Sequence, residues 1–71
     1  MSKADEMFEA LGYTKDDFQY EIHYGKEYHL IVFSIEDKAF MCNQNILYYP
    51  QLISMEDLNA INEKCKELGW I

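Results

Sequence analysis

The chain contains no arginine and little proline, glycine or cysteine: one Pro, three Gly and two Cys in 71 residues. Arginine is the preferred residue for bidentate contacts to phosphate and guanine, so its absence argues against direct nucleic-acid binding. Three isolated glycines do not form a phosphate-binding loop, and two cysteines allow at most one disulfide. No apolar run reaches membrane-spanning length and no secretory leader pattern is present, so we expect a cytoplasmic protein with reduced thiols.

Acidic residues and large apolar residues are abundant. Thirteen Asp and Glu face six Lys, which gives a formal net charge of −7, while 49% of residues are hydrophobic and 15% aromatic. The apolar content is sufficient for one folded domain over residues 1–71, although a chain of this length buries only about 60% of its unfolded surface. The acidic balance disfavours nucleic acid and anionic membranes and leaves basic protein surfaces as electrostatic partners.

Two segments carry the same helix start and stop signals. Each begins with a serine that can cap the first turn, followed three residues later by an aspartate that can reach back to the serine. Each ends in Leu-Gly-aromatic, where the glycine can adopt a left-handed conformation. We predict helices over residues 3–11 and 55–68. The signals are Ser2, Asp5 and Gly12 in the first segment and Ser54, Asp57 and Gly69 in the second.

The apolar spacing predicts which side of each helix is buried. The expected buried stripes are Ala4, Met7, Phe8 and Leu11 on the first helix and Leu58, Ile61, Cys65 and Leu68 on the second.

The middle of the chain predicts an antiparallel sheet. Residues 14–17 are interpreted as a polar connection, and the alternation that follows is typical of a strand with one wet face. Pro50 cannot donate to a ladder, so any strand that precedes it belongs at an edge. The elements predict an α+β fold of order α-β-β-β-(β)-α, with two helices packed on one face of the sheet. The predicted strands are 18–24, 28–35 and 39–42, with 46–49 as a candidate fourth.

Two registers are open for the first predicted hairpin. A two-residue loop at Gly25-Lys26 pairs Tyr24 with Glu27, as glycine in the first turn position favours. A three-residue loop pairs Tyr24 with Tyr28 and gives the better apolar match, so we favour it. The two registers place opposite faces of the second strand on the core.

The residues that could carry chemistry do not form a recognised pattern. The spacings of His23, His29, Cys42 and Cys65 match no zinc site, although the three-residue loop would place the two histidines opposite each other. The cysteines fit the role of small core residues. Adjacent carboxylates lie in predicted turns or at a helix start, where acid–base catalysis is not favoured. We therefore expect no enzymatic activity, no cofactor and no metal.

Apolar residues of the sheet are the first candidates for a partner-binding site. Tyrosine is enriched at interfaces, although a small sheet also needs large side chains to fill its core. The apolar residues of the strands are too many for one face, so some should remain on the open face, where a patch rimmed by charge would mark a partner or self-association site. The apolar candidates for partner binding are Ile31, Phe33, Phe40 and Tyr49.

Acidic residues of the first helix are the second candidates. Asp5, Glu6 and Glu9 lie opposite the apolar stripe. Acidic residues favour helix starts and aid solubility, which accounts for part of this charge. A more specific hypothesis is that they imitate the phosphate array of DNA and occupy a nucleic-acid-binding protein.

Both ends of the chain resemble one group of proteins. The sequences are ADEMFEALGY at residues 4–13 and ISMEDLNAINEKCKELGW at residues 53–70. They resemble small uncharacterised proteins encoded by temperate phages and prophages of low-GC Gram-positive bacteria. The resemblance implies a small accessory role in the cytoplasm of an infected or lysogenic bacterium, and it assigns no functional residues.

These observations lead to two hypotheses. The first is a non-enzymatic interaction module that binds a host or phage protein, in its sharpest form a DNA-mimic inhibitor of a host nucleic-acid-processing protein. The alternative is a structural or self-associating accessory protein, a homodimer with no separate ligand.

Overall fold

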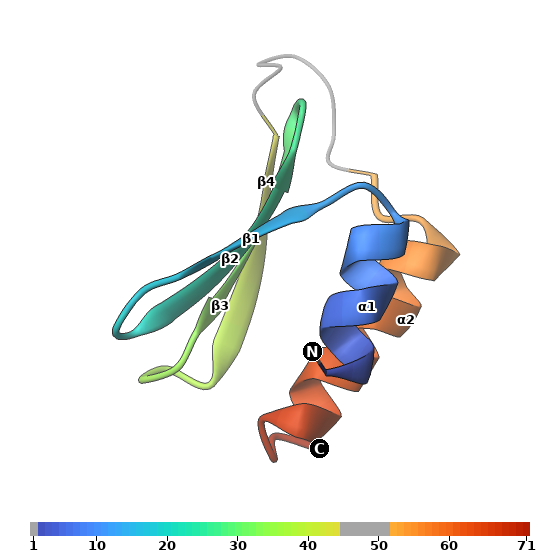
Figure 1. Ribbon diagram of the computed structural model, residues 1–71. Helices are drawn as coiled ribbons and strands as arrows, with labels where there is room; N and C mark the ends of the chain where they lie inside the picture. Colours follow the sequence, from blue (N-terminus) through green and yellow to red (C-terminus); the bar gives the residue numbers. More distant parts are fainter. Residues whose placement is uncertain (1, 45–51) are drawn as a thin grey trace.

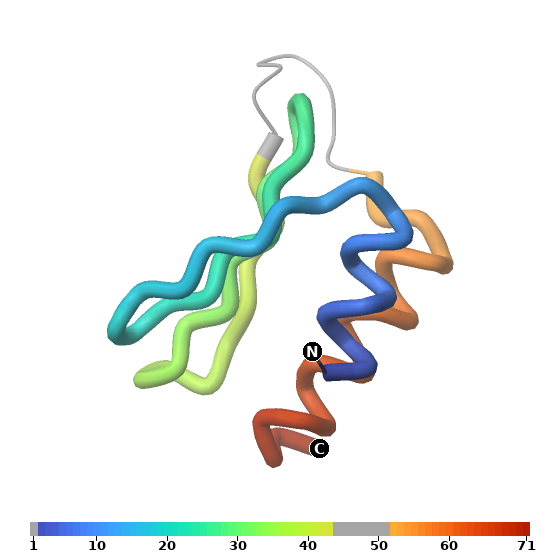
Figure 2. Tube along the Cα trace, viewed as in Figure 1, coloured from blue at the N-terminus to red at the C-terminus, as the bar shows by residue number. Residues whose placement is uncertain are grey.

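The computed structural model describes residues 2–44 and 52–71. The four strands form one antiparallel sheet in the order β1-β2-β3-β4. Figure 1 shows both helices side by side on one face of this sheet, and Figure 2 traces the path of the chain. The predicted α+β architecture is confirmed. Its elements are α1 (Lys3–Ala10), β1 (Thr14–Asp17), β2 (Glu21–Lys26), β3 (His29–Ser34), β4 (Ala39–Gln44) and α2 (Met55–Glu67).

Both helix starts are capped by a serine as predicted, but only one of the two aspartates accepts the backbone N–H of its capping serine. The Oγ atoms of Ser2 and Ser54 accept the N–H groups of Asp5 and Asp57, each at 3.0 Å. In α2, Asp57 also accepts the N–H of Ser54 at 3.3 Å, which completes a capping box. In α1, the carboxylate of Asp5 instead binds groups of the sheet and of α2, as described below.

The helix ends also match the prediction. Gly12 and Gly69 adopt φ of +92° and +77°, in the left-handed region that favours glycine. The next residue then donates its N–H back into the last turn, from Tyr13 to the carbonyl of Phe8 at 3.0 Å and from Trp70 to that of Cys65 at 2.9 Å. These bonds satisfy carbonyl groups of the last helical turn that would otherwise lack a partner. They also turn the segment that follows each helix toward the core.

The first strand differs from the prediction. Residues 14–17, interpreted as a polar connection, form edge strand β1, and the predicted strand 18–24 contains the turn between β1 and β2. All four β1 residues are exposed, so no alternation of apolar and polar residues marks this strand in the sequence. Backbone pairing with β2 defines it, with Lys15 opposite Tyr24. The candidate strand 46–49 lies outside the described residues.

Both predicted hairpin registers are wrong. The turn between β2 and β3 is Glu27-Tyr28, with Lys26 opposite His29 and Glu27 at φ +38°. The loop has two residues, but it lies two residues further along than the predicted Gly25-Lys26 loop. This register places Ile22, Tyr24 and their partners across the strand on the helix-covered face, which explains why it prevails.

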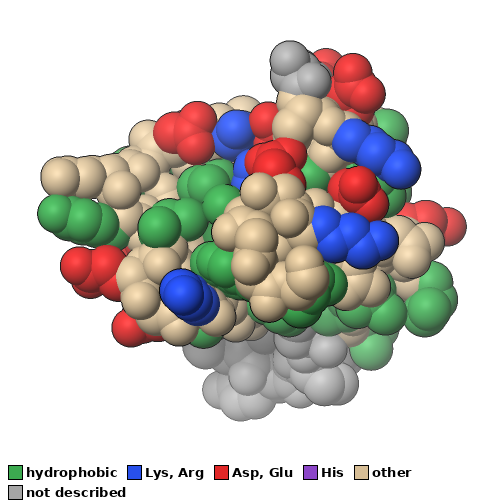
Figure 3. Space-filling view, turned by 90° about the horizontal axis from the view of Figure 1, so that it is seen from below, with side chains coloured by type: hydrophobic (Ala, Val, Ile, Leu, Met, Phe, Trp, Pro, Cys, Tyr) green, Lys and Arg blue, Asp and Glu red, His purple; other side chains and the backbone are tan. Residues whose placement is uncertain are grey.

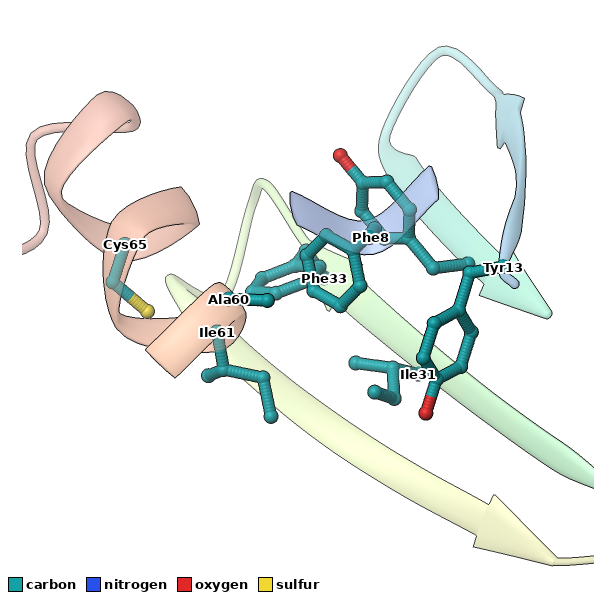
Figure 4. Packing of buried hydrophobic residues seen from close by; sticks show 8 residues of the cluster. Phe8, Tyr13, Ile31, Phe33, Ala60, Ile61 and Cys65 are labelled. Atoms are coloured by element: carbon teal, nitrogen blue, oxygen red, sulfur yellow. The ribbon is translucent and has the colours of Figure 1, made fainter. Parts of the chain in front are cut away.

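The core lies between the sheet and the two helices (Figure 4). The ring of Phe8 stacks on that of Tyr24 with centroids 3.9 Å apart and meets Tyr13 edge-on at 5.4 Å. Ile31 and Phe33 are fully buried in this cluster. Their expected place on the open face is therefore wrong. The register turns Leu30, Val32 and Met41 to the open face instead.

The buried side of α2 is also rotated from the predicted stripe. Asp57 and Lys64 are buried with Ala60, Ile61 and Cys65, while Leu58 is partly exposed. The two charged side chains are buried because each has a partner of complementary chemistry inside the fold, as charged groups in a protein interior require. Apolar periodicity alone does not predict such positions.

Candidate interaction surface

Asp5 lies in a network of polar side chains rather than on the outer face of α1. Its Oδ1 atom accepts the hydroxyl of Tyr24 at 2.6 Å, and its Oδ2 atom accepts Nζ of Lys15 at 2.9 Å. Nζ of Lys64 lies 3.6 Å from Oδ1. Burial opposes the charge of Asp5, but the bonds from Tyr24 and Lys15 and the charge of Lys64 outweigh it and lower the pKa to about 2. Asp5 therefore holds the fold together, and its expected place on a partner-binding face is wrong.

Lys64 completes this network from α2. It is almost fully buried and pairs with Glu67 as well as with Asp5. Its Nζ atom also lies 5.9 Å from the ring centroid of Tyr24. Two carboxylates and an aromatic ring thus compensate the desolvation of one ammonium group.

A second tyrosine–aspartate pair joins the start of α2 to the end of α1. The hydroxyl of Tyr13 donates to Oδ1 of Asp57 at 2.9 Å, and burial together with this carboxylate raises the pKa of Tyr13. Nζ of Lys26 lies 4.4 Å from the Tyr13 ring centroid and donates to the carbonyl of Leu11 at 2.8 Å. At neutral pH the Tyr13 hydroxyl therefore keeps its proton and donates it to Asp57 in a hydrogen bond.

The two histidines are not opposite each other in the sheet, and both cysteines are free thiols. His23 is opposite Val32, and its Nε2 atom lies 2.8 Å from Oε1 of Glu21. Burial, with a smaller effect of Asp57, raises the pKa of Cys42, and burial raises that of Cys65. Among the described residues, no group of three or more His, Cys, Asp or Glu is placed to hold a metal ion. Nor is any described helix long and apolar enough to cross a membrane.

The remaining predicted partner-binding residues do not form one surface. Glu6 and Glu9 are exposed on α1. Phe40 is half-exposed at the sheet edge, on the helix-covered face, with its ring centroid 5.9 Å from that of Phe33. Tyr49 lies outside the described residues.

A different surface forms where two turns meet at one end of the sheet. The N–H of Ile35, in the turn between β3 and β4, donates to the carbonyl of Tyr20, in the turn between β1 and β2, at 2.9 Å. The two joined turns carry three exposed apolar side chains, with Phe18 58%, Tyr20 52% and Ile35 36% exposed. Tyr20 and Ile35 are joined by this bond, while the ring of Phe18 lies against that of His23, with centroids 4.7 Å apart. Exposed apolar side chains that gather into a patch are a common mark of interaction sites.

Four carboxylates neighbour these apolar residues in the two turns and strand ends, together with Lys38. Asp17 pairs with Lys15, Glu21 with His23, and Asp37 accepts the hydroxyl of Ser34. In Figure 3, which views the molecule from below, hydrophobic and acidic side chains are interspersed along the left edge. Next to this end, a shallow hollow of about 190 Å³ on the open face is lined in part by Glu21 and Asp37. We call this end of the molecule the hairpin-end surface and define it as Phe18, Tyr20 and Ile35 with Asp17, Glu21, Glu36 and Asp37.

The sequence held a signal for the hairpin-end surface that the prediction did not use. Phe18 and Tyr20 follow Asp16-Asp17, and Ile35 precedes Glu36-Asp37. Two short segments therefore combine bulky apolar side chains with adjacent carboxylates. The pairing of β2 with β3, which continues in the bond from Ile35 to Tyr20, brings them together.

Comparisons with known proteins return no relative. No protein-family model matches the chain, and neither the curated proteins nor the solved structures contain a match.

Proposed function

We propose that the chain is a non-enzymatic interaction module that binds a basic protein through the hairpin-end surface. The observation that carries this proposal is the bond between Ile35 and Tyr20, which joins two turns that hold exposed apolar side chains and neighbouring carboxylates. The two helical segments resemble small proteins of temperate phages and prophages. We therefore place this module in the cytoplasm of a bacterium that carries a temperate phage.

The chemistry of the surface favours a partner that normally binds nucleic acid. Single-stranded nucleic acid presents aromatic bases next to anionic phosphates, and its binding proteins meet it with cationic grooves and stacking side chains. Phe18 and Tyr20 next to Asp17 and Glu36 present the same two chemistries. An arginine of the partner can stack on a ring and pair with a carboxylate at once. An inhibitor that competes with nucleic acid for such a site is the sharpest form of the proposal.

The internal use of lysine supports an acidic outer surface. Lys64 is buried, Lys15 pairs with Asp5 and Asp17, and Lys26 bonds to a backbone carbonyl. Lys64 and Lys26 therefore do little to neutralise the exposed carboxylates, whereas Lys15 offsets the charge of Asp17. Attraction to a basic partner follows and weakens as ionic strength rises.

Affinity capture from a Gram-positive bacterial lysate tests the proposal when matched variants are compared. Tyr20→Ala alters the hairpin-end surface, and Tyr28→Ala removes an equally exposed tyrosine (54% against 52%) from the turn between β2 and β3, at the opposite end of the sheet. Glu36→Gln and Glu27→Gln form a second pair with the same change of charge at the two ends.

We expect wild type, Tyr28→Ala and Glu27→Gln to retain a basic nucleic-acid-binding protein at low salt and to lose it at high salt. Tyr20→Ala and Glu36→Gln should retain less at every salt concentration. The captured protein, once purified, should lose its nucleic acid when the wild-type chain is added. Equal capture by both members of each pair would contradict a role for the hairpin-end surface.

A further inference from the structure

The two edges of the sheet differ sharply in charge. Edge strand β1 has the sequence TKDD, in which three of the four residues are charged, while edge strand β4 reads AFMCNQ and carries no charge. Proteins commonly protect exposed edges with charges, proline or bulges, because free N–H and C=O groups invite another strand. In the described part of the chain, no strand pairs with the outer edge of β4. This edge is neutral in a molecule of net charge −7.

We propose that β4 pairs with β4 of a second copy of this chain, in antiparallel orientation across a two-fold axis. Such a pairing brings the strand against itself, so every contact occurs twice and a charge near the middle of the strand would be set near its own copy. A strand without charge meets no such repulsion. It also offers no attraction to a basic partner, which favours a second copy as the occupant of this edge.

The acidic turn before β4 favours the antiparallel orientation. Glu36 and Asp37 precede the strand at the hairpin end of the sheet, separated from it by Lys38, and the turn keeps a net negative charge. Antiparallel pairing directs the two hairpin ends away from each other, whereas parallel pairing would bring them together and add like-charge repulsion. Two acidic molecules can therefore share this edge without opposing their carboxylates.

Apolar side chains on both faces of β4 would be covered by the pairing. Phe40 lies on the helix-covered face and Met41 on the open face, and they are 45% and 53% exposed. Cross-strand contacts between large side chains are the main source of stability between paired strands. The edge thus provides backbone groups and apolar area to a symmetric partner.

Sedimentation equilibrium of the purified chain tests the proposal without any other protein, so its outcome is independent of the proposed function. We expect a monomer–dimer equilibrium that shifts toward dimer at higher salt, since salt screens the repulsion between the two acidic copies. Met41→Lys should weaken the dimer by about tenfold or more, because the two introduced charges face each other near the axis. Met55→Lys, at a methionine of α2 that is 69% exposed, should leave it unchanged.

A second variant and a second readout distinguish a weakened dimer from a misfolded chain. Asn43→Lys, at another exposed residue of β4, should weaken the dimer in the same way, with circular dichroism unchanged in both variants. Hydrogen exchange should show amides of β4 that become protected as the concentration of wild type rises. A monomer at every concentration would overturn the proposal, and so would a dimer that Met41→Lys and Asn43→Lys leave intact.

Discussion

Replacing Asp5 by asparagine tests whether the buried polar network stabilises the fold. Asparagine keeps an oxygen that can accept the Tyr24 hydroxyl, so the change removes mainly the charge that faces Lys15 and Lys64. The pKa of Asp5 falls from 3.8 to about 2 in the folded protein. Since each pKa unit corresponds to about 1.4 kcal/mol, the charged form contributes about 2 kcal/mol to folding.

That contribution is large for a domain of this size. A small core without disulfides has a net stability of roughly 3–5 kcal/mol. With a urea slope of about 1 kcal/mol per molar, Asp5→Asn should lower the unfolding midpoint by about 2 M at pH 7. Asp16→Asn, at an exposed position of β1, makes the same change in net charge and should stay within about 0.5 kcal/mol of wild type.

The pH dependence of the difference identifies its cause. The depressed pKa means that the unfolded chain binds more protons than the folded protein between pH 2 and 3.8. The stabilisation by Asp5 is therefore complete above the unfolded pKa and is lost as the pH falls from 3.8 toward 2. The gap between wild type and Asp5→Asn should narrow over this range in urea titrations. A gap that stays constant down to pH 2.5, or no gap at pH 7, would refute the reasoning.

Three further substitutions or measurements probe the structure. Tyr13→Phe should destabilise the fold by about 1–2 kcal/mol in urea titrations, because the buried Asp57 loses a hydrogen bond from a neutral donor; no loss would mean that water replaces the hydroxyl. Gly69→Ala should lower the free energy of unfolding by about 1 kcal/mol and Gly69→Asn by less, because φ is +77° and nothing lies within 4 Å to obstruct a side chain. Equal losses of stability in the two variants would contradict a conformational cause. The Cys65 thiol should react with a thiol reagent far more slowly in the folded protein than in urea, because burial limits access and raises its pKa; equal rates would exclude a buried Cys65.

The helices could be predicted in detail because their signals are local. A serine cap acts within three residues, and a glycine in the left-handed region acts within the last turn. Ser54 and Gly69 therefore specify the start and end of α2 wherever the helix packs. The same locality explains why Asp5 was misjudged. Asp5 lies three residues after its capping serine, as Asp57 does. Its carboxylate nevertheless binds Tyr24 and Lys64, which are distant in the sequence.

The sheet was harder to predict because its register depends on distant contacts. Residues 28–35 are nearly continuously apolar, so either face of the strand could be buried. The choice that buries Ile31 and Phe33 depends on the fit of Tyr24 against Phe8 of α1. The hairpin-end surface follows from the same register, because only the folded sheet brings Ile35 to Tyr20.

The acidic residues divide into two groups by what they contact. Asp5 and Asp57 occupy the same position in the first turn of their helices, where a negative charge is favourable, and each accepts the hydroxyl of a buried tyrosine. Their replacement should therefore change stability. Glu36, by contrast, is exposed in a turn, where a charge contributes little to folding. If Glu36→Gln weakens the binding of a basic partner while the urea midpoint stays at the wild-type value, the charge at the hairpin end serves recognition. A lowered midpoint would instead show that the turn itself needs that carboxylate.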